Sequence, residues 1–279
     1  MTDGCSPISG ELARVIWRAN QKTKKNPARG RVPSAFQFRL GGAKGMVVQD
    51  RTLEGRVVLL RPSQVKFEAP EHRTFDIQST SLRPKAMFLN RPLIVLMEYL
   101  GSSIERIIEL QDRSINEAQS VRASFLNASK VLQQHGMGAS FHLPSLFRNM
   151  ASILNLTMAR HYNETEPEGM YNDLIATALH CAETHILREL KYRAHIAVPG
   201  SFTLLGVSDE WDCLAEGEIY ATVSDEKSKL YKEITGMVAI TRSPQIHPGD
   251  VQRVTAVRKK ELEHLTNVVV FSCRYVSAE

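Results

Sequence analysis

Short apolar runs, separated by glycine, proline and serine, fill the first third of the chain and predict strands. These runs cover residues 36–38, 46–48, 57–60 and 65–67. β-branched and aromatic residues favour strands, and glycine supplies the positive φ angles that tight bends require. We therefore expect a β-rich region over residues 31–92. Residues 1–30, whose end is rich in Lys, Arg and Asn, are predicted to be a basic N-terminal loop segment.

A helical pattern begins near Pro92 and predicts a helical region over residues 93–195. Apolar residues there recur at spacings of three, four and seven, which places them on one face of a helix. Pro144 suits the first turn of another helix, and a longer helix is predicted over residues 169–192. The first helical stretch carries the spacing on Ile104, Ile107, Ile108, Ile115 and Ala118. One face of the longer helix is expected to carry Leu174, Ala178, Cys181 and His185.

The strand pattern returns after residue 196, so the predicted order is strands, a helical insert, then strands again. Turn signals such as Pro199-Gly200 and Pro248-Gly249 separate the apolar runs. The pattern indicates an α+β fold whose second β-rich region covers residues 196–279. The expected strands are residues 196–198, 203–207, 217–223, 237–241, 251–257 and 268–271.

Composition narrows the class of protein only a little. A length of 279 residues with 43% hydrophobic residues is enough for a real core, and a net charge of +5 favours a polyanionic partner only weakly. A mildly basic soluble protein fits the same numbers. The four cysteines are far apart in sequence, which is typical of a reducing, intracellular setting. No signal sequence or bilayer-length apolar run is evident, so secretion and membrane insertion are not expected, and nucleus versus cytoplasm stays open.

Two basic segments near the start of the chain are candidates for binding phosphate. RLGGAKG contains Arg39 and Lys44, and RPSQVKF contains Arg61 and Lys66. The first is not a P-loop, because it lacks the Gly-Lys-Ser/Thr ending and precedes a strand pattern rather than a helix. Each segment by itself also fits a plain hairpin turn or the polar face of a strand.

Charged residues gather again in the C-terminal part of the chain. The acids could hold a metal or perform acid–base chemistry, but we interpret them as residues that fix a turn or face a basic partner. In TRSPQIHPGD a Pro-Gly turn lies between His247 and Asp250 and is preceded by Arg242, and for Arg242 and His247 a binding role and a structural role are equally consistent. No metal site is expected, since His180 and His185 miss the spacing of a helical zinc pair. The acids are Asp209, Glu210, Glu216 and Glu218.

Five segments occur in a fixed order: RLGGAKG, RPSQVKF, GSFTLLGVSDE, EGEIY and TRSPQIHPGD. Together they resemble the catalytic region of the cell-encoded RNA-dependent RNA polymerases of eukaryotic gene silencing, most closely those of fungi. The resemblance implies a double-psi β-barrel over residues 31–92, a helical connecting region over 93–195 and a second double-psi barrel over 196–279. It also implies synthesis of RNA from nucleoside triphosphates on a single-stranded RNA template, yielding double-stranded precursors of small interfering RNAs.

The resemblance assigns roles to the basic residues. Lys44 and Lys66 match the lysines that project from the first barrel toward the catalytic carboxylates of the second. Arg39 and Arg61 would join them in binding nucleotide or RNA phosphates, and Arg242 and His247 are expected to contact the template or the nucleotide. Proteins of the silencing pathway are further expected partners.

One motif of the family is missing. In those enzymes an Asp-x-Asp-Gly-Asp segment that binds Mg²⁺ follows the last strand, whereas this sequence contains no Asp-x-Asp-x-Asp arrangement. The resemblance thus implies Mg²⁺ for the complete enzyme, with neither Mg²⁺ nor catalytic residues expected in this chain. We expect a truncated second barrel with residues 268–271 as an exposed edge, and an isolated chain that is inactive and poorly soluble.

Three interpretations stay open from the sequence. The chain is a segment of an RNA polymerase, a non-catalytic RNA-binding or interaction protein derived from the polymerase fold, or an α+β protein whose motifs are coincidental. Salt-sensitive RNA binding through Lys44 and Lys66 is expected under the first two interpretations.

Overall fold

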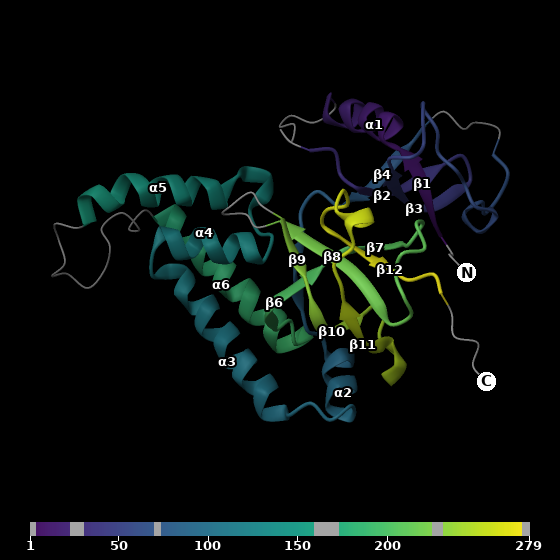
Figure 1. Ribbon diagram of the computed structural model, residues 1–279. Coiled ribbons are helices and arrows are strands. Elements are labelled where there is room, and N and C mark those ends of the chain that lie inside the picture. Colours follow the sequence, from purple (N-terminus) through teal and green to yellow (C-terminus); the bar gives the residue numbers. More distant parts are fainter. Residues whose placement is uncertain (1–3, 23–30, 70–73, 159–172, 225–230, 275–279) are drawn as a thin grey trace. The chain divides into compact units, whose positions relative to one another are not determined.

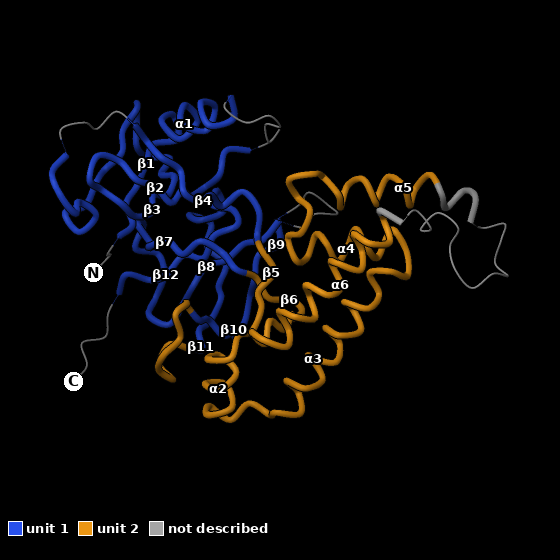
Figure 2. The backbone as a smooth tube through the Cα atoms, turned by 180° about the vertical axis from the view of Figure 1, so that it is seen from behind, with its two compact units in different colours: residues 1–84, 203–241, 252–279 blue, residues 85–202, 242–251 orange. Residues whose placement is uncertain are grey.

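The computed structural model describes residues 4–22, 31–69, 74–158, 173–224 and 231–274. They form two compact units, one of residues Met1–Pro84, Thr203–Thr241 and Gln252–Glu279, the other of Lys85–Phe202 and Arg242–Val251 (Figure 2). The helices are α1 (Gly10–Lys22), α2 (Arg91–Tyr99), α3 (Ile104–Gln119), α4 (Phe125–Gln134), α5 (Leu143–Met158) and α6 (Asp173–Arg193) (Figure 1). The strands are β1 (Cys5–Ser9), β2 (Ala35–Leu40), β3 (Ala43–Asp50), β4 (Asp76–Thr80), β5 (Lys85–Phe88), β6 (Ala197–Thr203), β7 (Leu205–Ser208), β8 (Glu218–Ser224), β9 (Tyr231–Ile234), β10 (Gly236–Thr241), β11 (Val251–Ala256) and β12 (Val268–Phe271).

The first unit contains a four-stranded sheet in the order β1-β3-β2-β4. β1 runs parallel to β3, while β2 is antiparallel to both β3 and β4. Phe36 and Val47 are fully buried in its core, and helix α1 packs against them through Trp17, whose ring centroid lies 6.4 Å from that of Phe36. The predicted strands at residues 36–38 and 46–48 are confirmed.

Two predictions for the N-terminal part were wrong. Residues 1–30 were expected to form a loop, but they include the strand β1 and the helix α1. All five residues of β1 are buried, so its short sequence shows no alternation of polar and apolar positions. Residues 57–60 and 65–67 form only isolated bridges, at Val58 and Val65, because a 3₁₀ turn at Pro62–Gln64 separates them.

The second sheet of the same unit has the order β10-β11-β8-β12-β7, and β9 pairs with β8. Every predicted strand after residue 196 is present. Strand β12 lies between β8, to which it is antiparallel, and β7, to which it is parallel. Val268 and Val270 are fully buried. The expectation that residues 268–271 form an exposed edge was therefore wrong, because both sides of this strand are hydrogen-bonded.

The two sheets of this unit share one core. Ala35 and Val48 of the first sheet pack with Val207, Tyr220 and Val270 of the second. Backbone and side-chain hydrogen bonds add to the packing: Thr266 N donates to Ser34 Oγ at 2.9 Å, and Asn267 Nδ2 donates to the Leu82 carbonyl at 3.0 Å. The two β-rich regions of the sequence thus fold as parts of one unit.

The second unit is mainly helical, with a short ribbon of β5 and β6. Pro144 lies in the first turn of α5 and the glycines of residues 133–141 separate α4 from α5, as predicted. The predicted face of α6 was wrong, because Ala178, Cys181 and His185 are exposed. Packing selects the neighbouring face of that helix. The buried side chains of α6 are Leu179, Ala182 and Ile186.

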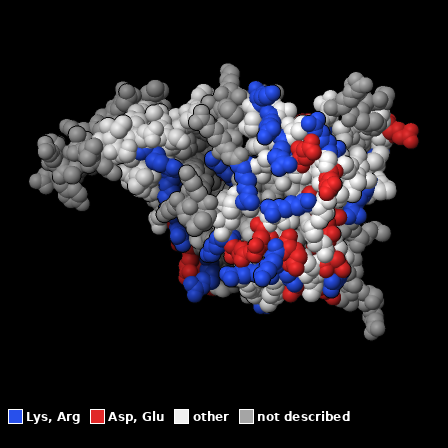
Figure 3. Space-filling model, turned by 45° about the horizontal axis from the view of Figure 1, so that its top comes forward, with Lys and Arg blue, Asp and Glu red and all other residues white. Residues whose placement is uncertain are grey.

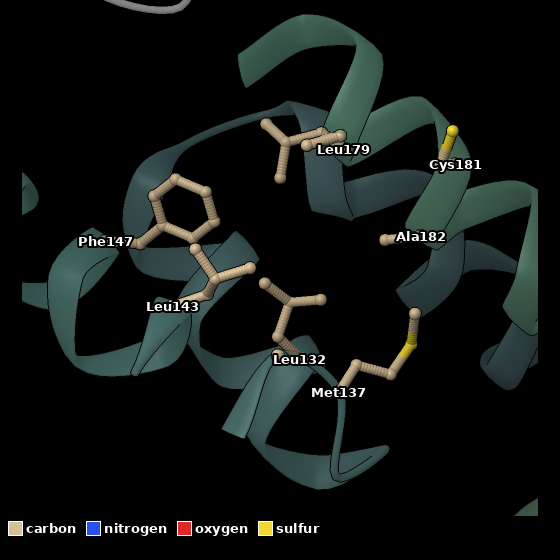
Figure 4. A pocket seen from close by; sticks show the side chains of 9 residues that line it. Leu132, Met137, Leu143, Phe147, Leu179, Cys181 and Ala182 are labelled. Carbon is tan, nitrogen blue, oxygen red and sulfur yellow. The ribbon is translucent and has the colours of Figure 1, made fainter. Parts of the chain in front are cut away.

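An apolar cavity of about 170 Å³ opens among helices α4, α5 and α6. The side chains of Leu132, Leu143 and Phe147 converge on it (Figure 4). These are residues of the helical core or packed against it. The cavity is therefore a gap in apolar packing and offers no charged group to a polyanion.

None of the helices in the described ranges has the length and apolar character needed to cross a bilayer.

Three aromatic rings of the helical unit lie together, with Phe88 stacked on His195 and His135 tilted against both. The Phe88 ring lies 4.0 Å from that of His195 and 5.2 Å from that of His135, between centroids. Burial, together with a smaller effect of nearby His195 and His185, lowers the pKa of His135 to about 4. Burial also lowers the pKa of His195, while Glu189 raises it and Arg193 lowers it. Protonation of either ring is thus opposed in the folded state.

We predict that the helical unit loses stability in mild acid. Because the pKa of His135 is depressed from 6.5 to about 4, its contribution is complete above pH 6.5 and is lost as the pH falls toward 4. The unscreened shift corresponds to roughly 3 kcal/mol, and solvent screening of a partly exposed ring reduces this to about 1–2 kcal/mol. Thermal unfolding followed by circular dichroism across this range measures it. His135→Phe should flatten the profile and His180→Gln should not; equal profiles for wild type and His135→Phe would contradict the assignment.

Candidate functional site

A tight hairpin places two of the candidate cations directly opposite each other. Gly41 and Gly42 join β2 to β3 with φ angles of 46° and 82°, the left-handed conformation that two-residue hairpin turns require. In the resulting register Arg39 pairs with Lys44. Directly opposed side chains on a sheet have Cβ atoms about 5 Å apart, and like charges in this position repel. Both side chains are exposed, and within the described ranges neither has an ion-pair partner.

The second basic segment lies against this hairpin. Lys66 N donates to the Gly42 carbonyl at 2.9 Å, and Val65 forms a β-bridge with Ala43. A Cβ atom at Gly42 would collide with the carbonyl of Phe67, so the approach of the two backbones requires glycine. The side chain of Lys66 is exposed and its Nζ donates to the Ser63 carbonyl at 2.5 Å. The fold thus brings RLGGAKG and RPSQVKF together.

Gln64, which the sequence analysis did not single out, organises this contact. Its side chain is fully buried. Oε1 accepts from Arg61 N at 3.0 Å, while Nε2 donates to the carbonyls of Met46 at 3.0 Å and Gly4 at 3.2 Å. At Gly45 a Cβ would lie 2.5 Å from the Gly4 carbonyl oxygen and 2.7 Å from Gln64 Nε2. The only signal of Gln64 in the sequence is its position two residues after Pro62, where a glutamine can cap a short turn.

Arg61, unlike Arg39, Lys44 and Lys66, forms an ion pair. Its Nε donates to the Cys5 carbonyl at 2.7 Å, and its Nη2 forms a 2.7 Å ion pair with Glu210 Oε2. The Glu210 side chain is 9% exposed and also accepts from Ser208 Oγ at 2.6 Å. This ion pair joins the RPSQVKF segment to the GVSDE segment. Phosphate binding by Arg61 stays a prediction.

Two of the other acids, Asp209 and Glu218, are used in turns, as the sequence analysis interpreted them, whereas Glu216 is exposed and its role stays a prediction. Buried Asp209 accepts from Trp211 N at 3.1 Å and Leu214 N at 2.7 Å. Glu218 accepts from Ala215 N at 2.9 Å and lies 3.4 Å from Lys259 Nζ, and the first of these contacts lowers its pKa most. These carboxylates stabilise the local fold.

Arg242 and His247 belong to the other unit, where His247 begins the predicted Pro-Gly turn and Arg242 lies five residues before His247. Asp250 Oδ2 accepts from His247 N at 2.8 Å and from Ile246 N at 2.7 Å, and these bonds lower the pKa of Asp250. His247 Nδ1 accepts from Gly249 N at 3.0 Å. Arg242 is exposed and lacks an ion-pair partner in the part of the chain that the structure describes.

Asn90 is the N-cap residue of α2. Its Oδ1 accepts from Leu93 N at 2.9 Å, as expected for an N-cap. Its Nδ2 donates to Gln245 Oε1 at 3.2 Å, which ties α2 to the TRSPQIHPGD segment.

Known proteins resemble this chain over nearly its whole length. A family model described as RNA dependent RNA polymerase matches residues 1–275. The chain belongs to this family. It is 28% identical to Probable RNA-dependent RNA polymerase 1 of Oryza sativa subsp. japonica, covering 97% of this chain and 33% of that protein. RNA-dependent RNA polymerase 1 of Schizosaccharomyces pombe is 29% identical, covering 97% of this chain and 22% of that protein.

Solved structures of the polymerase family share the fold. The RNA dependent RNA polymerase QDE-1 from Thielavia terrestris superimposes with a TM-score of 0.71 at 22% identity, covering 99% of this chain and 31% of that one. The mixed fold of helices and sheets is therefore that of a polymerase of this family. The chain spans about a fifth to a third of the length of the curated relatives it matches.

The ion pair of Arg61 and Glu210 yields a stability prediction. Lysine at position 61 can reach only one of the two oxygens that the guanidinium contacts, so Arg61→Lys should lower the free energy of unfolding by about 1–2 kcal/mol. Urea unfolding measures the change. In a double-mutant cycle with Glu210→Gln, the two substitutions should couple by about 1 kcal/mol, because they remove the same interaction. Strictly additive effects would show that the pair contributes nothing.

Proposed function

We propose that this chain forms part of the catalytic region of an RNA-dependent RNA polymerase and binds phosphates of RNA or nucleotide with Arg39, Lys44 and Lys66. The observation that carries the proposal is the opposition of Arg39 and Lys44 on the β2–β3 hairpin. Neither forms an ion pair within the described ranges, and Asp76 of β4 faces Arg39 on the other side. Two like charges directly opposed on a sheet destabilise it. A phosphate bound between the two side chains would attract both of them and offset their repulsion. The pair is therefore suited to binding phosphate.

Rigid strands suit this task. Phosphate transfer requires cations that are already in place when charge develops, since reorganisation would weaken their effect. Arg39 and Lys44 extend from paired strands, and Lys66 is held against the same hairpin by backbone hydrogen bonds. Arg61 is proposed as a further phosphate contact, through the part of its guanidinium not engaged by Cys5 and Glu210.

The activity proposed for the whole enzyme is RNA-templated RNA synthesis. Its substrates would be single-stranded RNA and nucleoside triphosphates, and its product double-stranded RNA for small-RNA gene silencing, with silencing proteins as further partners. Membership of the polymerase family supports this proposal. We further propose that Arg242 and His247 contact the template or the nucleotide. The four free cysteines favour an intracellular, reducing setting.

For the fold we propose a first double-psi β-barrel over residues 31–92, a helical connection over 93–195 and a second barrel over 196–279. Parallel and antiparallel pairs occur together in both sheets of the first unit, which supports a barrel of mixed connectivity. The likeness to the polymerase from Thielavia terrestris adds to that support.

Mg²⁺ is the metal that this family implies. Across the described residues no group of three or more His, Cys, Asp or Glu side chains is arranged to hold a metal ion. Asp209, Glu210 and Glu218 are occupied by turn hydrogen bonds and ion pairs. The described residues therefore do not fit Mg²⁺. We propose that the polymerase holds its metal with residues outside this chain.

RNA binding by this chain tests the phosphate site. We expect the double substitution Lys44→Ala with Lys66→Ala to weaken binding of single-stranded RNA about tenfold and to lower the log–log salt slope by about 1.4, two phosphate contacts at about 0.7 each. Fluorescence anisotropy of a labelled oligoribonucleotide across a salt series measures both quantities. Lys130→Ala with Lys260→Ala removes the same charge from two other exposed positions and serves as the control. Equal losses in the two double variants would leave no special role for the hairpin.

Polymerisation by the isolated chain tests the assignment of the metal. With an RNA template, four nucleoside triphosphates and Mg²⁺, we expect no extension product on a denaturing gel, while RNA binding persists. The reason is that the described residues hold no cluster of carboxylates arranged to bind the ion, and the sequence contains no Asp-x-Asp-x-Asp arrangement. A product that disappears in the Lys44→Ala, Lys66→Ala variant would refute the proposal that the metal ligands lie elsewhere.

A further inference from the structure

Helix α1 carries a row of cations on its outer face. Arg14, Arg18 and Lys22 follow one another at intervals of four residues, which places them on the same side of a helix. All three side chains are exposed. Figure 3 tips the top of Figure 1, where α1 lies, toward the viewer, and lysine and arginine side chains lie in the upper middle of that face with a few acidic side chains beside them. We call these three residues the α1 basic row.

The charges of the α1 basic row are not compensated. Glu11 is the only acid in the helix sequence, and its carboxylate already accepts from Arg56 Nε at 2.9 Å. Within the described ranges no member of the row forms an ion pair. Like charges four residues apart on a helix cost about 0.2–0.5 kcal/mol for each pair. The helix therefore retains a repulsion that a bound anion would relieve.

The opposite face of α1 shows which class of partner fits. Ala13 and Trp17 are buried in the core that contains Phe36 and Val47. A helix that lies on a membrane, or in the groove of a helix-binding protein, needs a free apolar face. Here that face is occupied, and only the cationic face remains open. A polyanion that makes contacts through its charges alone is the partner that this surface suits.

We propose that the α1 basic row is a second RNA-binding surface, which takes the sugar–phosphate backbone of an RNA strand. The rise from residue 14 to residue 22 is about 12 Å at about 1.5 Å per residue. That distance is long enough to span several successive phosphates of one RNA strand. The surface rests on the proposed RNA function of the chain, and it extends the bound RNA beyond the β2–β3 hairpin.

RNA length separates the two surfaces. The test uses the 279-residue chain with Arg14→Gln, Arg18→Gln and Lys22→Gln combined, because glutamine keeps the helix propensity and removes the charge. Anisotropy is measured with labelled oligouridines of about 4 and about 20 nucleotides, the shorter fitting one charged cluster and the longer reaching both. We expect the triple variant to bind the longer RNA at least tenfold more weakly, with a salt slope lower by about 2. The hairpin by itself is sufficient to bind the shorter RNA, so the affinity of the triple variant for that RNA should change less than twofold.

Two controls exclude trivial causes. Lys130→Gln, Arg253→Gln and Lys260→Gln together remove the same charge from exposed positions elsewhere, and they should change the affinity less than threefold. Arg14→Lys with Arg18→Lys keeps the charge and should bind as the unaltered chain does. If circular dichroism shows that the triple variant melts at a lower temperature, the lysine variant decides the question. It keeps the positive charges, so a loss of RNA binding in that variant would overturn the proposal that the surface binds through charge.

The outcomes distinguish this inference from the proposed function. If the Lys44→Ala, Lys66→Ala variant loses affinity for both RNAs and the α1 variant for neither, the α1 basic row is refuted and the hairpin site stands. If only the α1 variant loses affinity, the hairpin assignment fails instead. Equal losses from the α1 triple and the control triple show that net charge alone matters. Displacement of the RNA from the row by polyglutamate at equal charge concentration would assign the surface to an acidic protein and overturn the RNA proposal.

Discussion

The close contact between the β2–β3 hairpin and the segment that follows it determines where the cations of the candidate site lie. Two backbones approach at Gly42 and Gly45, where any side chain would collide with a carbonyl or with the buried amide of Gln64. Gln64 then uses both ends of its amide to bind three separate backbone groups. Because these bonds are buried, losing one would leave an unsatisfied polar group at a cost of about 1–3 kcal/mol. The positions of Lys44 and Lys66 are consequences of this packing.

A second constraint connects this part of the unit to a distant part of the sequence. Arg61 contacts Glu210 and the carbonyl of Cys5, so its guanidinium bridges β1 and the turn after β7. Arginine suits this position because its planar group can donate in two directions at once. The shared core of Ala35, Val48, Val207 and Val270 supports the same connection by apolar packing. Motifs that are far apart in the chain are therefore held by one set of contacts.

The sequence predicted elements whose signals are local and missed those that depend on distant partners. Gly41 and Gly42 indicate a hairpin turn, and the apolar runs after residue 196 indicate strands, so the turn and these strands could be predicted. β1 was missed because all five of its residues are buried and lack alternation. The basic residues at the end of the 1–30 segment were interpreted as a loop, so helix α1 was missed. Its Trp17 packs on Phe36, which belongs to a later strand. For β12 the apolar run was correctly predicted as a strand, but its neighbours are set by non-local pairing.

The candidate site shows the same division. Arg39, Lys44 and Lys66 could be singled out because lysine and arginine beside glycine or serine form a recognisable pattern. Gln64 carries no such pattern, since a glutamine after a proline is ordinary on a protein surface and only the fold buries it. The engagement of Arg61 by Glu210 also depends on chain segments that the sequence does not place together.

The central position of β12 has a consequence for the order in which the protein can fold during synthesis. β7 leaves the ribosome well before β12, yet β12 is its neighbour in the sheet, and β8 likewise waits for one of its partners. Pairings between distant segments close large loops, and they form slowly. Until residues 268–271 emerge, the nascent chain exposes unpaired strand edges of the kind that attract chaperones or other unfolded chains.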